Sequence, residues 1–291
     1  MSDSAIELVW DIKCGTGESC TWDAARGLVW FTDIPNAVLH AYAPESGATQ
    51  TWHLPGKAPS FGVCRSGRLV MALRDRVVLY HPATGETTPL TGPIDQPSRV
   101  RLNDGKVGPD GCFWVGGMDE DKAKEPVAAL WRITPDGRVE RKIEGYVNSN
   151  GLAWWPDGSV MFHSDTRPGY IEAFDFDAAT GRLSNRRRIA TLTNEEGRPD
   201  GGATDAEGCY WSAGNSAACL HRFAPDGALL ARVRLPVPRP TMPCFVGQAL
   251  YVTTLRQGAD DATLAQHPTM GGLFRLAAPV AGAAVALFAD T

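Results

Sequence analysis

The sequence has no paired cysteine motif, no long apolar run and no excess of charge of one sign. Its seven cysteines are an odd number without a C-x-x-C pair, which argues against both a disulfide framework and a thiolate metal site. No apolar run approaches the ~18 residues of a membrane-spanning helix, and residues 1–10 lack the basic and apolar regions of a signal peptide. These absences predict a reduced, soluble, cytoplasmic protein.

Two further absences narrow the possible functions. The formal net charge is −5, and the basic residues are dispersed apart from the run 186–188, so a basic footprint for nucleic acid is missing. Neither a G-x-S-x-G nor a Walker-type motif occurs, which argues against serine-hydrolase and P-loop chemistry. We therefore expect neither a nucleic-acid nor a membrane partner.

Glycine, proline and tryptophan are frequent instead, at 31, 21 and 9 residues, which is typical of many short strands joined by tight turns. One pattern recurs: a strand begins at a polar residue, runs to a glycine turn and returns as a second strand. In the three clearest copies the polar residue lies eight positions before the turn glycine. These copies are NDGKVGPDGCFWVGG (103–117), NGLAWWPDGSVMFHS (150–164) and DGGATDAEGCYWSAG (200–214), with related stretches at 17–31, 60–73 and 242–254.

Six copies at a spacing of roughly 40 to 50 residues predict a repeat architecture. A second strand–turn–strand unit with an apolar period of two follows each copy, so each repeat is a four-stranded antiparallel sheet rather than a helix pair. We therefore predict an all-β, six-bladed β-propeller that forms a single domain over residues 1–291. The unpaired strand at 6–12 is expected to close the ring by joining the last blade, at 272–287. The segments 118–128 and 255–271 are expected to be loops.

Equivalent positions at the start of the innermost strands face one another across a propeller axis. Glu18, Asn103, Asn150 and Asp200 fill this position in four repeats. Asn and Asp also favour Asx-Gly turns, but Glu has no such preference, so the coincidence favours a functional site. Oxygen ligands without cysteine or histidine indicate a hard divalent cation such as Ca²⁺, Mg²⁺ or Mn²⁺.

Other polar residues near these positions have two interpretations each. Arg101 shares a strand face with Asn103 and is either a substrate contact for a polyhydroxylated or anionic ligand or an ordinary surface arginine. The acidic run 119–121 forms either a lid or a solvated loop. His163 is more readily explained as a strand histidine with satisfied hydrogen bonds than as part of a catalytic pair with Asp165.

Four short motifs carry a family resemblance. GE at 17–18, R-x-ND at 101–104, SNG at 149–151 and PDG at 199–201 together resemble the senescence marker protein/gluconolactonase family, which includes regucalcin. The resemblance covers nearly the whole chain in the right order, and FHSDT (162–166) with the segment 243–274 is most similar to bacterial sugar lactonases acting on xylono- or arabinonolactone. The chain departs from the family pattern at Ser19 and Cys20, where Gly-Pro is common, at Leu102, where proline is usual, and at Gly202, where a larger apolar residue is usual.

The resemblance implies a six-bladed propeller that binds one divalent metal and hydrolyses a small sugar lactone. The metal identity stays open among Ca, Mg, Mn, Zn and Fe(II). Asp200 doubles as the candidate general base, because it is a carboxylate at the metal. The implied metal ligands are Glu18, Asn150 and Asp200, and the implied substrate contacts are Arg101, Asn103 and Glu120.

We therefore expect a sugar lactonase that turns an aldonolactone, pentono- or hexono-, into the sugar acid. Two alternatives remain at this point. One is a non-catalytic Ca²⁺-binding regulatory propeller, because a fold alone does not determine function. The other is an esterase or phosphotriesterase that uses the same metal site. We expect the protein to be a monomer.

Overall fold

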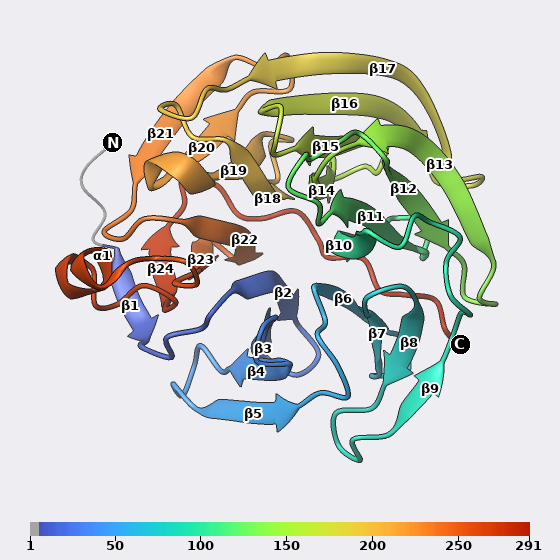
Figure 1. The fold of residues 1–291 in the computed structure, drawn as a ribbon, viewed down its shortest axis with the longest axis horizontal. Coiled ribbons are helices and arrows are strands. Elements are labelled where there is room, and N and C mark those ends of the chain that lie inside the picture. The colour runs from blue at the N-terminus through green and yellow to red at the C-terminus, as the bar shows by residue number, and fades with distance from the viewer. Residues whose placement is uncertain (1–5) are drawn as a thin grey trace.

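The computed structural model describes residues 6–291, and residues 1–5 of the predicted single domain lie outside the described part. Six four-stranded antiparallel sheets are arranged in a ring around a central axis (Figure 1). This confirms the predicted six-bladed β-propeller. In each blade the first strand along the chain lies nearest the axis, apart from the last blade, whose outermost strand comes from the N-terminus.

The strands follow the repeats in chain order. The first blade contains β2 (Gly17–Asp23), β3 (Leu28–Asp33), β4 (Val38–Tyr42) and β5 (Thr49–His53), and the second contains β6 (Ser60–Val63), β7 (Leu69–Ala72), β8 (Val77–Tyr80) and β9 (Thr87–Pro89). The third contains β10 (Val100–Val107), β11 (Phe113–Asp119), β12 (Ala128–Ile133) and β13 (Val139–Tyr146), and the fourth contains β14 (Ser149–Trp154), β15 (Val160–Asp165), β16 (Tyr170–Asp177) and β17 (Arg182–Thr191). The fifth contains β18 (Pro199–Thr204), β19 (Tyr210–Gly214), β20 (Cys219–Phe223) and β21 (Leu229–Arg234), and the sixth contains β22 (Pro240–Val246), β23 (Ala249–Thr254), β24 (Leu273–Ala277) and β1 (Glu7–Trp10).

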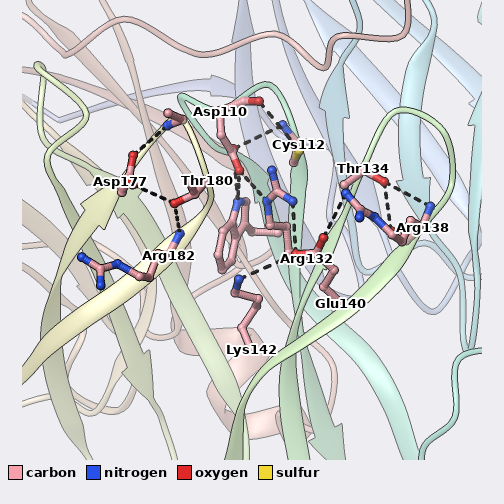
Figure 2. A network of polar contacts seen from close by, with 12 residues as sticks. Asp110, Cys112, Arg132, Thr134, Arg138, Glu140, Lys142, Asp177, Thr180 and Arg182 are labelled. Atoms are coloured by element: carbon pink, nitrogen blue, oxygen red, sulfur yellow. Dashed lines mark hydrogen bonds and ion pairs between the residues drawn. The ribbon is translucent and has the colours of Figure 1, made fainter.

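A buried aspartate near the turn between the two inner strands is a repeated packing device. In the third blade, Asp110 accepts a hydrogen bond from the Trp114 indole at 3.2 Å and forms an ion pair with Arg132 at 2.8 Å (Figure 2). Asp205 binds the indole of Trp211 in the same way, at 3.0 Å, in the fifth blade. Because an unpaired buried carboxylate is costly, these partners hold the second and third strands of these two blades against the turn.

The ring closes at the N-terminus, as the sequence predicts. Strand β1 pairs antiparallel with β24, so it supplies the fourth strand of the last blade. The Trp10 ring then lies 5.7 Å from the Phe31 ring of the first blade, measured between centroids. One short strand from the N-terminus therefore completes the last blade and contacts the first, which ties the two ends of the chain together.

The C-terminal segment departs from the prediction that the last blade extends through residues 272–287. Only β24, Leu273–Ala277, is a strand, because β1 occupies the edge where the predicted outer strand would pair. Residues 278–291 instead cross from the last blade to the opposite side of the ring (Figure 1). The Ala283 amide donates to Thr204 O at 3.0 Å, and Phe288 forms a bridge to Cys64 of the second blade. The tail thus ties several blades together.

The loop predicted at 255–271 contains one short helix, α1 (Asp261–Gln266). The Asp260 side chain caps this helix by accepting a hydrogen bond from the Thr263 amide at 2.8 Å. No helix within residues 6–291 has the length and apolar character to cross a membrane.

Candidate functional site

The innermost strands share an irregularity just where the sequence places the candidate site residues. The antiparallel register shifts between Glu18 and Thr21 in β2, between Leu102 and Gly105 in β10, between Asn150 and Ala153 in β14 and between Pro199 and Gly202 in β18. A bulge breaks strict side-chain alternation and re-aims the side chains at that point. At each bulge, consecutive residues of the strand are therefore no longer restricted to opposite faces of the sheet.

Asn103 and Asn150 come together across neighbouring blades, as the repeat alignment predicts. The Asn103 Nδ2 atom lies 3.1 Å from Asn150 Oδ1 and 3.0 Å from both Asn148 Oδ1 and Ser149 O. Asn150 in turn donates from Nδ2 to the Thr166 hydroxyl at 2.7 Å. These contacts fix the orientation of both amides, with the Asn150 oxygen directed toward Asn103 rather than toward Thr166.

Asp200 and Glu18 lie close enough to influence each other's protonation. Burial, together with the negative charge of Asp104, raises the pKa of Asp200 to about 8, although a 2.9 Å hydrogen bond from Asn215 to Asp200 Oδ2 opposes the rise. Burial followed by repulsion from Asp200 and Asp104 raises the pKa of Glu18 well above its usual range. The structure therefore places both predicted carboxylates in one electrostatically strained cluster.

Asp104 is a third carboxylate of this cluster, and the sequence did not identify it. It is 3 % exposed, burial raises its pKa, and its Oδ1 atom has no hydrogen-bond partner within residues 6–291. Strict alternation assigns Asn103 and Asp104 to opposite strand faces, but the bulge between Leu102 and Gly105 removes that restriction. The signals in the sequence were its position directly after Asn103 and its place in the R-x-ND motif at 101–104.

Arg101 and Glu120 lie beside this cluster at the rim. The Arg101 guanidinium donates to Asn103 Oδ1 at 2.8 Å, and its Nε atom lies 3.5 Å from Glu120 Oε1. Glu120 also binds Arg74 of the preceding blade at 2.6 Å, between Oε2 and NH1. Glu120 is therefore neither a free acidic lid nor a detached solvated residue, because two arginines anchor it next to Asn103. Sequence reasoning missed Arg74, which carries no motif.

His163 has the ordinary role that the sequence favoured. Its ring is buried in β15, with Nε2 2.6 Å from the Ser149 hydroxyl and Nδ1 3.1 Å from Glu172 Oε1. Asp165, its predicted alternative partner, accepts instead from the backbone amides of 147 and 148. The histidine is thus a satisfied strand residue and forms no catalytic pair with Asp165.

Two other groups of metal-binding side chains occur among residues 6–291, each with its ligand atoms within 4.8 Å of one another. Neither includes Glu18 or Asp200. Existing polar contacts occupy both groups: Asp33 accepts hydrogen bonds from the amides of residues 15 and 16, and Arg222 pairs with Asp205 at 2.8 Å. The groups are Cys14, Asp33 and His40, and Asp205, Glu207 and Cys209.

A divalent cation fits the channel cluster on physical grounds. Three carboxylates with raised pKa values converge there, and one buried oxygen, Asp104 Oδ1, has no partner. A bound cation would favour their ionised forms and satisfy such oxygens. The donor chemistry, carboxylate and amide oxygen without sulfur or imidazole, suits a hard cation. Glu18, Asn150 and Asp200 supply that donor set from three different blades.

Fold and site together define a class: a closed six-bladed propeller with a carboxylate-rich channel. The chain belongs to the family described as SMP-30/Gluconolactonase/LRE-like region, which it matches over residues 16–256. This confirms the family resemblance seen in the short motifs.

Two curated relatives and one solved structure illustrate the similarity. The chain is 32% identical over 284 residues to regucalcin from Oryctolagus cuniculus, covering 95% of each chain. It is 33% identical over 279 residues to 6-deoxy-6-sulfogluconolactonase from Pseudomonas putida, covering 94% of each chain. The crystal structure of regucalcin from Agrobacterium tumefaciens, described as a calcium-binding protein, superposes with a TM-score of 0.90 at 26% identity, covering 98% of this chain and 97% of the other.

Proposed function

We propose that the protein hydrolyses a sugar lactone to the corresponding sugar acid in a metal-dependent reaction. The observation that supports this proposal is the buried group of Glu18, Asp104 and Asp200, whose charges act on one another, together with the hydrogen bonds that link Arg101 to Asn103 and Asn103 to Asn150. The similarity to a lactonase of Pseudomonas putida over 94% of both chains supports the same activity. We propose a pentono- or hexonolactone as the substrate, because the polar rim offers hydrogen bonds to several sugar hydroxyls.

In this proposal Glu18, Asn150 and Asp200 hold the metal. When bound, a divalent cation supplies Lewis-acid stabilisation of the charge that develops on the lactone carbonyl oxygen and acidifies water. Asp200 acts as the general base and takes the proton of the attacking water on its carboxylate. Asn215 holds Asp200 Oδ2 at 2.9 Å, which fixes the carboxylate while its other oxygen receives the proton. No covalent intermediate is required.

Arg101, Asn103 and Glu120 orient the substrate. The Arg101 guanidinium is already oriented by Asn103 Oδ1 and Glu120, so it presents its remaining donors without a large loss of side-chain freedom. Glu120, which is about one-third exposed, offers a carboxylate to sugar hydroxyls at the rim. Preoriented donors of this kind favour the bound geometry in which the ester carbonyl meets the attacking water.

A non-catalytic calcium-binding regulator is the second candidate, because the protein from Agrobacterium tumefaciens with the same fold is described as calcium-binding. A panel of pentono- and hexonolactones with a pH-indicator readout distinguishes the two. The protein is first stripped with a chelator and then restored with Ca²⁺, Mg²⁺, Mn²⁺, Zn²⁺ or Fe²⁺. A lactonase releases acid above the spontaneous rate only after metal is restored. A regulator binds calcium, measured by calorimetry, yet turns over no lactone.

We propose further that the protein is a cytoplasmic monomer. All seven cysteines are free and buried, which suits a reducing compartment. Cell fractionation with an activity assay and sedimentation velocity of the purified protein check the two statements separately. Activity confined to the extracellular fraction, or a sedimenting species of twice the chain mass, would contradict them.

A further inference from the structure

Cys20 and Cys244 form a close pair of thiols across the junction where the ring closes. Their Sγ atoms lie 3.0 Å apart, and the two residues are separated by 224 positions in the sequence. Cys20 lies on β2, the innermost strand of the first blade, and Cys244 lies on β22, the innermost strand of the last. Among the seven cysteines, all of which lie within residues 6–291, no other pair makes a sulfur–sulfur contact.

Both thiols are buried, and both border a cavity. Both cysteines line a space of about 270 Å³ at the end of the inner strands opposite Glu18 and Asp200. Other walls come from Trp22 and from residues 283–286 of the C-terminal tail. A single water occupies about 30 Å³, so the cavity has room for a peroxide-sized molecule beside the two cysteines.

We propose that Cys20 and Cys244 are a modification site: an oxidisable dithiol that closes to an intrachain disulfide under a hydroperoxide. A disulfide requires sulfur atoms about 2.05 Å apart, so the pair must approach by roughly 1 Å. Both thiols sit on strands of adjacent blades that already contact one another. The bond links the first blade to the last and makes the ring covalently closed at its innermost strands.

The reaction balances with the hydroperoxide as the only co-reactant. One cysteine loses its proton and attacks the peroxide as a thiolate; a sulfur–oxygen bond forms as the oxygen–oxygen bond breaks, and the departing oxygen takes up the proton and leaves as water, or as an alcohol from an organic peroxide. The second thiol then displaces the sulfenic hydroxyl, which leaves as water while the sulfur–sulfur bond forms. The two sulfur atoms together lose two electrons and two protons to the peroxide.

Intact-mass analysis and peptide mapping of the full-length protein test this proposal. After treatment with hydrogen peroxide and blocking of free thiols, we expect the protein to lose two hydrogen atoms and to yield one linked peptide containing residues 20 and 244. The cross-link constrains the unfolded chain through a long loop, so the thermal midpoint should rise by about 5 °C or more and return after reduction with dithiothreitol.

Single variants provide the matched controls. Cys20→Ser and Cys244→Ser should each remove both the linked peptide and the rise in midpoint, whereas Cys64→Ser, a buried cysteine of another blade, should keep both. If Cys20→Ser and Cys244→Ser fail to fold, peptide mapping of the oxidised wild-type protein still tests the proposal, because it needs no variant. Added oxygen without a linked peptide, or a link between other cysteines, would overturn the proposal.

Discussion

At the scale of a single residue, burial of the Asp200 carboxylate lowers the stability of the metal-free protein and suits the residue to its proposed role. It is 8 % exposed, it lies near Asp104, and its pKa rises to about 8 because of burial and that neighbouring charge. An ionised carboxylate in this position is unfavourable unless a cation offsets it. In the proposed reaction the same position is useful, because a bound cation would hold the carboxylate ionised beside the substrate.

The raised pKa of Asp200 predicts the pH dependence of the metal-free protein. In the unfolded chain this carboxyl has a pKa near its ordinary value of 3.8, so between about pH 4 and pH 8 the folded form binds more protons than the unfolded form. Stability should therefore fall as the pH rises through this window. Asp200→Asn removes the charge and should stabilise the chelated protein near pH 8 by on the order of 2 kcal/mol, measured by urea unfolding.

Asp95→Asn is the matched control for this experiment, because Asp95 is fully exposed. It should leave the pH dependence unchanged. Equal slopes of stability against pH for wild type and Asp200→Asn would show that Asp200 ionises normally in the folded protein.

Arg101 separates substrate binding from metal binding. Arg101→Ala should reduce kcat/KM for the best lactone by on the order of 1.5–3 kcal/mol, or about tenfold to more than a hundredfold, because charge-assisted hydrogen bonds are lost. Metal affinity, measured by calorimetry, should change only a few-fold, because Arg101 donates to Asn103 rather than to a proposed metal ligand and acts on Glu18 through its charge alone. Arg99→Ala, at a neighbouring arginine that pairs with Glu125 instead, should retain activity. A loss of metal affinity as large as the loss of turnover would contradict this division.

At the residue scale, the sequence predicts polar positions well and their partners poorly. The repeat spacing identified Glu18, Asn103, Asn150 and Asp200, because equivalent positions of a cyclic repeat face a common axis. Asp104 was not predicted as a site residue, because a pattern that assumes strict side-chain alternation does not reveal a bulge. The departures from the family pattern also need structure to be understood: Leu102 donates its amide to Arg74 O at 2.8 Å, which a proline cannot do.

At the scale of elements, the C-terminal tail is a strap made of irregular backbone. Its amides donate to blade backbone at several points, for example from Phe288 to Val63 O at 2.9 Å and from Ala289 to Gly111 O at 3.0 Å. The Asp290 carboxylate pairs with Arg68 at 2.8 Å. These bonds replace the strand ladder that the tail lacks, so its polar groups remain satisfied.

Phe288 anchors this strap and supports a prediction at the element scale. Its side chain is fully buried between the second and third blades, while the adjacent Leu287 is 42 % exposed. Phe288→Ala should lower the free energy of unfolding by about 3–4 kcal/mol, because an aromatic side chain leaves a cavity in a packed core. Leu287→Ala should cost less than about 1 kcal/mol, measured by the same urea titration. Equal effects of the two variants would mean that the tail does not pack as a strap.

The sequence predicts most strands of the fold but not the irregular C-terminal tail, residues 278–291. Strands between glycine turns were predictable because the apolar period of two repeats in every blade. The tail, with APVAGAAVAL at 278–287, also contains apolar residues typical of a strand, yet β1 already occupies the free edge of β24. Helix α1 was missed as well, because its six residues are too few to show a helical period. Competition for a sheet edge is a tertiary property that no local pattern records.

For the whole molecule, stability depends on how the two ends of the ring are joined. The first and last blades contact along β2 and β22, where Cys20 meets Cys244, and on the outside, where β1 pairs with β24. Trp10 strengthens the outer junction, because its ring lies against Phe31 and also 5.4 Å from the His40 ring of the first blade. An open ring would expose one strand edge and the apolar faces of two blades.

Deletion of residues 1–10 therefore tests the closed ring as a unit. Removal of β1 exposes the edge of β24 and leaves the Phe31 and His40 rings without Trp10. The loss of the partly buried Trp10 alone is worth about 2–3 kcal/mol, which lowers the thermal midpoint of a protein this size by about 3–5 °C. Deletion of residues 1–5 is the control and should change the midpoint little, because it leaves β1 intact.

We propose that the ring is one domain, so calorimetry should show a single transition in wild type and in both deletions. If the protein without residues 1–10 melts at the wild-type temperature, the pairing of β1 with β24 does not stabilise the propeller. If it melts in two separated steps, the blades do not unfold as one cooperative unit.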